Sequence, residues 1–223
     1  MTVYSDQHDF ASVVPQLADC VPQPVPIERL EVLRLGRQVL VRAHSRGGQT
    51  GTAICNFRAG ILLPILKELV MPVFAGRDAR LVERWVKEVY RRHYKYHGTP
   101  LFNCIAYVET AVLDLLGHVA GRPVCELLGT VVKTEFDCYL SRLDRDTRPE
   151  EEVEILQRRL AETGARAVKF KVGGRMNRDV DSIAGRTEAL IPLMRRRLGD
   201  AVTLYVDGNG AFTSNTAIAI GRQ

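Results

Sequence analysis

The amino-acid sequence predicts a small α+β domain followed by a parallel α/β region within 223 residues. Short alternating apolar stretches joined by turn residues come first, and helix-like stretches follow them. After Gly129 strand-like and helix-like stretches alternate with short connections, which is typical of βαβ units in a parallel sheet. We therefore expect an N-terminal extension over residues 1–25, the α+β domain over 26–130 and the parallel domain over 131–223.

The α+β domain is expected to begin with an antiparallel meander. Its strands are predicted over residues 27–35, 38–44 and 50–55. Gly47 and Gly48 suit the hairpin between the second and third strands, because glycine adopts positive φ without steric cost. Apolar residues at helical spacing then predict helices over residues 61–69, 78–94 and 105–119. Gly121 and Pro123 are expected to end the last of these helices.

The second domain is expected to alternate strands with helices. Strands are predicted over residues 135–141, 167–172 and 203–207. Helices are predicted from Pro149 to Gly164, over most of residues 177–198, and from Ser214 onwards. This order predicts a parallel sheet with helices packed against it.

Composition and charge argue against several classes of protein. The net charge is +5, but the basic clusters alternate with acidic or apolar positions, so we expect solvated helix faces and no nucleic-acid partner. The five cysteines are dispersed, which is typical of reduced intracellular thiols. The N-terminus lacks the pattern of a secretory signal, and no stretch was expected to reach the roughly 20 apolar residues of a membrane helix. We expect a cytoplasmic protein without a membrane partner.

Two lysines stand out in the strand predicted over residues 167–172. Side chains alternate along a strand, so Lys169 and Lys171 share one face while Val168, Phe170 and Val172 share the other. A parallel strand is normally buried on both faces, and two inward-facing lysines are costly unless they have a function. The alternative is an edge strand with both lysines in water.

A carboxylate ends the next predicted strand. Asp207 comes at the carboxyl end of residues 203–207, where parallel α/β folds place their chemistry, and Asn209 points the same way. Neighbouring strands lie about 4.8 Å apart, so Asp207 is expected within reach of Lys171. Such a group suits proton abstraction beside a metal-bound anion, because a nearby cation makes a lysine ammonium easier to deprotonate. The alternative is that Asp-Gly-Asn-Gly is an ordinary turn.

Three segments resemble the enolase superfamily in its mandelate racemase-like branch. They are VETAVLDLLG at residues 108–117 with AGRPV at 120–124 and LLG at 127–129, Lys-Phe-Lys at 169–171, and Asp-Gly-Asn at 207–209. The resemblance covers residues 27–215 and implies an α+β capping domain. The first three βα units of a TIM-type (β/α) barrel would follow, and the barrel would be truncated.

The resemblance also implies roles for four residues. Lys171 corresponds to the acid/base, and Lys169 to a lysine that tunes it and meets the substrate carboxylate. Asp207 corresponds to the first ligand of Mg²⁺, and Asn209 to a polar residue that supports the site. The family's remaining metal ligands and its second base would lie beyond Gln223.

Weaker candidates come from other loops. In this family the capping domain covers the active site, and Arg37, Asn56 and Arg58 fall in the corresponding loops. Tyr139 and Ser141, near the end of the first barrel strand, could line the pocket. An ordinary surface role for the first three, or plain packing for the last two, is the alternative.

The resemblance implies Mg²⁺-dependent abstraction of the proton α to a carboxylate. Dehydration of a sugar acid is the leading hypothesis, and racemisation or epimerisation of a hydroxy or amino acid is the second. The third is a non-catalytic truncated paralogue. We expect a small carboxylate substrate and a homo-oligomer when the protein is full length. Residues 1–223 alone are expected to show no Mg²⁺-dependent turnover.

Overall fold

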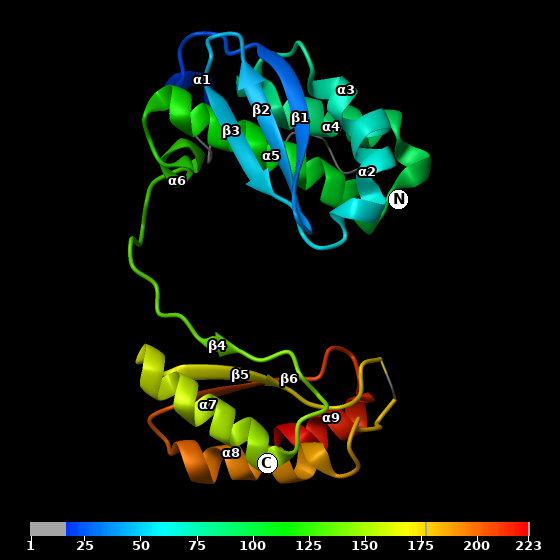
Figure 1. Ribbon diagram of the computed structural model, residues 1–223, viewed down its shortest axis with the longest axis vertical. Helices are drawn as coiled ribbons and strands as arrows, with labels where there is room; N and C mark the ends of the chain where they lie inside the picture. The colour runs from blue at the N-terminus through cyan, green and yellow to red at the C-terminus, as the bar shows by residue number, and fades with distance from the viewer. Residues whose placement is uncertain (1–16, 177, 223) are drawn as a thin grey trace, which may run out of the picture. The chain divides into compact units, whose positions relative to one another are not determined.

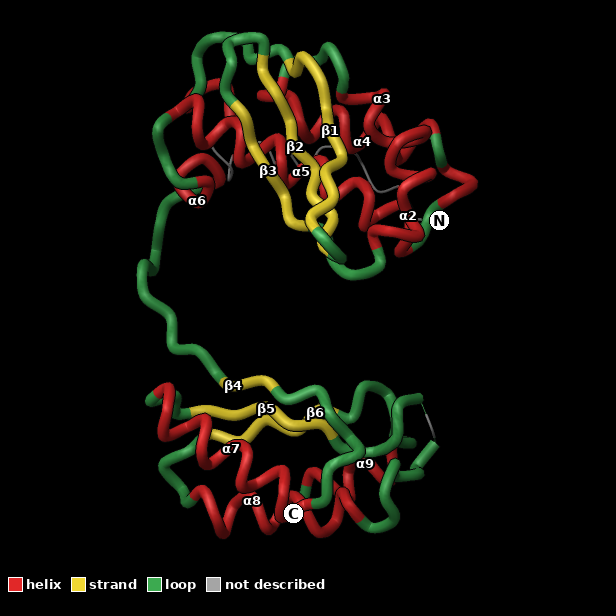
Figure 2. Tube along the Cα trace, viewed as in Figure 1, coloured by secondary structure: helices red, strands yellow, loops and turns green. Residues whose placement is uncertain are grey.

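The computed structural model describes residues 17–176 and 178–222 (Figures 1 and 2). By their internal contacts the residues divide into two units, Met1–Val132 and Lys133–Gln223. Each unit has its own cluster of buried apolar side chains. Each is therefore organised around a core of its own.

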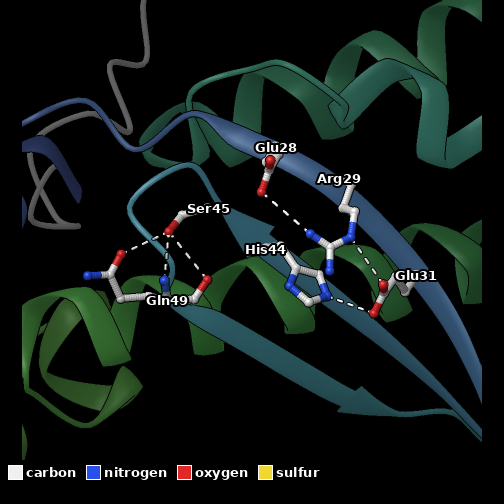
Figure 3. Close-up of polar contacts among 6 residues, drawn as sticks. All are labelled: Glu28, Arg29, Glu31, His44, Ser45 and Gln49. Atoms are coloured by element: carbon white, nitrogen blue, oxygen red, sulfur yellow. Dashed lines mark hydrogen bonds and ion pairs between the residues drawn. The ribbon is translucent and has the colours of Figure 1, made fainter.

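The first unit contains the predicted antiparallel meander. Its strands are β1 (Ile27–Leu35), β2 (Gln38–Ser45) and β3 (Thr50–Ile54), in the order β1-β2-β3. Along β2 the side chains of Val39, Val41 and Ala43 are buried, and those between them face the other way. On that other face His44 Nε2 lies 2.7 Å from Glu31 (Figure 3). The two-residue alternation therefore sets which side of the sheet packs on the helices.

The longest helix, α5 (Thr99–Ala120), packs against β2 and β3 (Figure 1). Gly121 ends it in the left-handed conformation, with φ of 63° as predicted. By length and composition this helix could cross a membrane, which corrects the expectation that no stretch comes near that length. Its apolar stripe, however, is buried against the sheet, as in the core helix of a soluble protein.

Gly51 lets β3 approach α5 closely. A Cβ atom at this position would overlap the backbone nitrogen of Leu115 and the carbonyl oxygen of Ala111. We expect Gly51→Ala to destabilise the first unit by about 3 kcal/mol, because neither backbone can move without disturbing the core. The sequence contains a single tryptophan, Trp85 of the first unit, so urea unfolding followed by its fluorescence measures this effect.

Gly129 provides a matched control for Gly51. Its backbone is extended, with φ of 162°, and nothing lies within 4 Å of a Cβ built there. Gly129→Ala should change the free energy of unfolding by no more than about 0.5 kcal/mol. Equal effects of the two substitutions would show that the close packing of β3 on α5 has been misjudged.

Most of the remaining helices of the first unit lie around α5. They are α2 (Ala59–Ile65), a π-helical turn (Leu66–Val70), α3 (Met71–Phe74), α4 (Val82–Arg92) and α6 (Val124–Leu128), with 3₁₀ turns at Ala79–Leu81 and Tyr94–Tyr96. The first of these helices was predicted over residues 61–69. The chain instead stays helical to Phe74, because Pro72 lies in the first turn of α3, where a missing N–H is tolerated.

Residues 17–25, part of the predicted extension, lie against the core. They include α1 (Leu17–Cys20), and Val21 and Val25 are 3% and 6% exposed. Asp78 accepts a hydrogen bond from the Val25 backbone at 3.1 Å, and Arg80 donates to the carbonyl of Pro22 at 2.8 Å. The prolines gave this segment little periodicity, which is why the sequence did not reveal its packing. Residues 1–16 lie outside the described part of the chain.

The carboxylate of Asp78 should make this attachment dependent on pH. Burial opposes its ionisation, but hydrogen bonds from Arg80 and the Val25 backbone outweigh burial and hold the pKa of Asp78 below its ordinary value. A depressed pKa adds stability above the unfolded-state pKa that is lost as the pH falls through the folded-state pKa. Asp78→Asn should therefore cost about 2 kcal/mol at neutral pH.

The difference between wild type and Asp78→Asn should be smaller at a pH of about 3 than at neutral pH, because below about 3.9 the carboxyl takes up a proton more readily in the unfolded chain than in the folded one. Urea unfolding followed by Trp85 fluorescence at both pH values measures it. A difference that stays constant down to that pH would mean that the charge of Asp78 contributes nothing.

The second unit contains a parallel sheet in the order β4-β5-β6. Its strands are β4 (Leu140–Ser141), β5 (Ala167–Lys171) and β6 (Thr203–Asp207), and its helices are α7 (Pro149–Thr163), α8 (Arg186–Leu198) and α9 (Ser214–Gly221). Figure 1 shows α7 and α8 on one side of this sheet. Val168 and Phe170 of β5 are 0% exposed and pack with apolar residues of these two helices.

Two elements of the second unit differ from the prediction. The strand predicted over residues 135–141 is reduced to β4, because Leu140 pairs with Val168 and β5 has no residue before Ala167 to pair with earlier positions. The helix predicted over residues 177–198 begins only at Arg186. Before it, Asp181 accepts hydrogen bonds from Thr187, and such side-chain contacts compete with helix formation. Residue 177 itself is not described.

Candidate active site

The two predicted lysines lie on the face of the sheet that α7 and α8 do not cover. In the parallel register Lys169 pairs with Tyr205 and Lys171 with Asp207. Because paired residues of neighbouring strands point to the same side, these four side chains share one face. The apolar residues between them on β5 fill the opposite face, so the strand alternation fixes the orientation of both lysines.

Lys171 and Asp207 form the centre of the site. The Nζ atom of Lys171 donates hydrogen bonds to Oδ2 of Asp207 and, at 2.7 Å, to Oδ1 of Asn209. The side chain of Lys171 is 7% exposed, whereas that of Asp207 is 24% exposed. A buried ammonium therefore donates two hydrogen bonds beside a carboxylate that water or a ligand can still reach.

Lys169 lies farther from the same carboxylate. Its Nζ is 3.7 Å from Asp207 Oδ2 and 5.4 Å from the centre of the Tyr139 ring. The Tyr139 ring is in turn 5.6 Å from that of Tyr205. Lys169 thus lies between a carboxylate and an aromatic ring.

The electrostatics of Asp207 follow from these contacts. The hydrogen bond from Lys171 holds the pKa of Asp207 below its ordinary value. Burial acts in the opposite direction, while the Asn209 backbone N–H, at 3.0 Å from Oδ1, and the charge of Lys169 lower it further. Asp207 is therefore an ionised carboxylate at neutral pH.

The loops that follow the strands hold this arrangement in place. Arg186, 2% exposed, donates from Nη1 to the carbonyl of Lys171 at 2.7 Å and from Nε to the carbonyl of Thr147 at 2.6 Å. Glu152, 0% exposed, accepts two hydrogen bonds from Arg142. The carboxyl ends of the strands are thus tied to α7 and α8 by buried polar groups.

The other predicted residues have different surroundings. Tyr139 lies on the lysine face, and Ser141 pairs with Lys169 and is exposed. In the first unit Arg37, Asn56 and Arg58 are exposed at the end of the sheet where β1 and β3 finish. Asn56 caps the Arg58 backbone at 2.9 Å, and the Arg58 guanidinium lies 4.3 Å from the centre of the Phe57 ring.

Arg145 and Arg186 were missed by the sequence analysis. Arg145, in the loop between β4 and α7, is 7% exposed and donates from Nη2 to Asn209 Oδ1 at 2.8 Å. It stands between Asp144 and Asp146, a pattern that is typical of a solvated loop. No local signal in the sequence distinguishes it from the many exposed arginines.

A hollow of about 800 Å³ lies near the amino ends of the strands of the same sheet. Its lining includes Phe136, Ala167 and Thr203, which are at or before the amino ends of the strands. Lys171 and Asp207 are at the carboxyl ends. The lining includes Tyr139 and Tyr205 of the lysine face but neither lysine nor Asp207, so the hollow adjoins the lysine site without containing it.

The donor set matches a divalent cation only in part. Asp207 offers one carboxylate, and Asn209 Oδ1 is already engaged by two cations. Over residues 17–176 and 178–222 no group of three His, Cys, Asp or Glu side chains could hold a metal. Mg²⁺ prefers six oxygen ligands, so Asp207 would be one protein ligand among several.

Both units match families of known proteins. Residues 14–129 match the family model described as the N-terminal domain of mandelate racemase / muconate lactonizing enzyme. Residues 151–223 match the model described as enolase C-terminal domain-like.

Two curated relatives are an isomerase and a dehydratase. A 3,6-anhydro-α-L-galactonate cycloisomerase from Streptomyces coelicolor is 28% identical over 82% of this chain and 50% of its own length. A D-mannonate dehydratase from Caulobacter vibrioides is 31% identical over 56% of this chain and 28% of its own. The chain thus spans half or less of the length of these relatives.

Solved structures share the fold. A proposed racemase from Roseobacter denitrificans has a TM-score of 0.82 and 32% identity, covering 90% of this chain and 54% of its own. A mandelate racemase/muconate lactonizing protein from Paracoccus denitrificans, complexed with magnesium, has a TM-score of 0.81 and 23% identity, covering 89% of this chain and 55% of its own. With a family model matching more than half of its residues, the chain belongs to the mandelate racemase/muconate lactonizing enzyme family of the enolase superfamily.

Proposed function

We propose that this chain carries the proton-transfer half of an enzyme that removes the proton α to a carboxylate. The observation that supports this most directly is the contact of buried Lys171 with Asp207, beside Lys169, at the carboxyl ends of two parallel strands. Parallel α/β folds, whether open sheets or closed barrels, place their catalytic residues at the carboxyl ends of the strands. We further propose that β4–β6 and their helices are the first three units of a (β/α) barrel.

Each side chain has a chemical role in this proposal. Lys171, as the neutral amine, takes the α-proton and can return it to the same carbon or to a leaving group. Lys169 is more exposed and binds the substrate carboxylate as an ammonium. Asp207 supplies an oxygen ligand to Mg²⁺. When bound, Mg²⁺ would stabilise the negative charge that develops on the substrate carboxylate as the proton leaves.

Dehydration of a sugar acid is the reaction that we favour. Loss of the α-proton and then of the β-hydroxyl as water gives an enol, which becomes a 2-keto acid by proton transfer. The support comes from relatives that are D-mannonate and D-galactonate dehydratase family members, including one 36% identical over 41% of this chain. That stretch is short, so the substrate is proposed at the level of an acid sugar.

Isomerisation is the second candidate, because one relative is a cycloisomerase and one structural neighbour is a proposed racemase. In that case the proton removed by Lys171 would be returned to the carbon skeleton without loss of water. The mass of the product distinguishes the two reactions, since only dehydration makes the product lighter than the substrate by one water molecule.

A library of acid sugars tests the proposal. The protein encoded by the complete reading frame that contains this chain would be incubated with each acid and Mg²⁺, and 2-keto acid formation would be measured. We expect at least one acid to be converted only when Mg²⁺ is present. If neither a keto acid nor an isomer forms from any of them, the catalytic proposal is wrong and the non-catalytic paralogue remains.

The reading frame offers a second, independent check of the non-catalytic alternative. An enzyme of this kind needs further carboxylate ligands on successive strands after β6. We expect two acidic residues at strand ends in the sequence that follows Gln223. A frame that terminates there would favour the paralogue, because Asp207 cannot hold Mg²⁺ alone.

A further inference from the structure

The buried guanidinium of Arg145 lacks the partners that would offset the cost of burying its charge. It is 7% exposed, and over residues 17–176 and 178–222 no carboxylate lies within 4.0 Å of its guanidinium. Its Nε atom is buried and has no hydrogen-bond partner among the described residues. Burying a cation without a counter-charge is costly, and so is an unpaired buried N–H.

Two neighbouring arginines are satisfied in the usual way. Arg142 binds the carboxylate of Glu152 with two hydrogen bonds, at 3.0 Å and 3.1 Å. Arg186 binds two backbone carbonyls. The hydrogen bond of Arg145 is instead directed at Asn209, a residue of the site. Arg145 lies after β4 and Asn209 after β6, so the contact joins the two outer strands of the sheet across β5.

Asn209 contacts three charged residues of the site. Its φ of 47° is in the left-handed region, which asparagine tolerates better than most residues. Its backbone N–H binds Asp207, and its Oδ1 accepts from both Arg145 and Lys171. Two cationic donors on one oxygen decide which way the side-chain amide faces. The Nδ2 atom has no acceptor among the described residues and is left as a donor.

We propose that Arg145 is a positioning residue, which fixes the Asn209 amide with its oxygen toward Lys171 and its NH₂ group free to donate to an oxygen atom of the substrate. The orientation of the amide rests on the geometry of this chain alone. The role of the NH₂ group toward substrate rests on the proposed function. Arg145 would thereby set the donor pattern of the site without touching the reacting atoms.

Arg145→Met separates positioning from stability. Methionine fills the volume without a buried charge, so stability should be unchanged or higher, whereas the Asn209 amide should lose its single orientation. Arg142→Met is the matched control. It leaves Glu152 buried without its cationic partner and should lower stability, yet Asn209 should keep its conformer. Arg145→Lys retains one donor and should restore the orientation at least in part.

Two measurements on the protein from the complete reading frame decide the matter. In crystal structures, Asn209 should have one side-chain conformer in the wild type and in Arg142→Met, but a rotated or divided one in Arg145→Met. In kinetics, Arg145→Met should lower kcat/KM by about tenfold, the effect of losing a hydrogen bond to a charged group. In an Asn209→Ala background the same change should have less than about a twofold effect, because Arg145 acts through Asn209.

An unchanged Asn209 conformer in Arg145→Met would overturn the proposal. So would a loss of kcat/KM from Arg145→Met that is as large in the Asn209→Ala background as in the wild type. If the wild type converts no acid at all, the proposed function fails by itself. The crystal structures then still decide whether Arg145 orients Asn209, since that readout needs no turnover.

Discussion

Replacing Lys171 with alanine is expected to slow α-proton removal by about 10²–10⁴-fold, the usual contribution of a positioned acid or base. The reason lies in the contacts of Lys171, whose buried ammonium is held between Asp207 and Asn209 at the sheet edge. The measurement is the exchange of the substrate α-proton in D₂O, followed by NMR on the protein from the complete reading frame.

Two further variants separate proton transfer from charge. Lys171→Arg keeps the positive charge beside Asp207, but a guanidinium is always protonated, so we expect it to be as slow as the alanine variant. Lys133→Ala removes an exposed lysine of the same unit and should exchange at the wild-type rate. If Lys171→Ala folds and retains more than about a tenth of the rate, Lys171 is not the acid/base.

Asp207→Asn is expected to weaken Mg²⁺ binding by at least roughly 10–100-fold, the range in which loss of even an outer-shell partner lowers metal affinity. The substitution removes the negative charge that Lys171 and Lys169 now face and leaves a neutral oxygen. Titration calorimetry of the variant and the wild type with Mg²⁺ measures the change.

A matched carboxylate makes the Asp207 result specific. Asp137, in the same unit, forms only an exposed ion pair with Arg166 at 3.5 Å, and Asp137→Asn should bind Mg²⁺ as the wild type does. If Asp207→Asn also binds with unchanged affinity, Asp207 is not a ligand, and the match of residues 207–209 to the family's metal strand carries no function here.

Much of the fold could be predicted because it depends on periodicity. The alternation over residues 27–55 predicted three strands to within a residue or two, and the observed β6 has the predicted bounds. Gly121 and Gly164 end their helices in the left-handed conformation, with φ of 63° and 66°. In each case the deciding interaction is local or repeats along the element, so the sequence alone contains it.

The differences arise where the outcome depends on a distant partner. The first strand of the parallel sheet is short because β5 begins at Ala167, which the composition of residues 135–141 cannot reveal. The start of α8 is delayed by hydrogen bonds of Asp181 with Thr187 and of Asp179 with Thr213. Those contacts depend on loops folding against each other.

In the site, too, the residues on strands could be predicted and the contact between loops could not. Strand alternation placed Lys169 and Lys171 on one face, and the parallel register brings Asp207 opposite Lys171. The roles assigned to these residues remain predictions. Arg145 could not be foreseen, because its contact with Asn209 spans 64 positions of sequence and depends on two irregular loops.

The exchange of substrate α-protons with solvent tests the central claim most directly. Protein from the complete reading frame would be incubated with acid sugars in D₂O, with and without Mg²⁺, and the α-proton signal followed by NMR. The account predicts that at least one acid loses this signal in a Mg²⁺-dependent way and that Lys171→Ala abolishes the loss. Exchange that needs no Mg²⁺, or that persists in the Lys171→Ala variant, would contradict it.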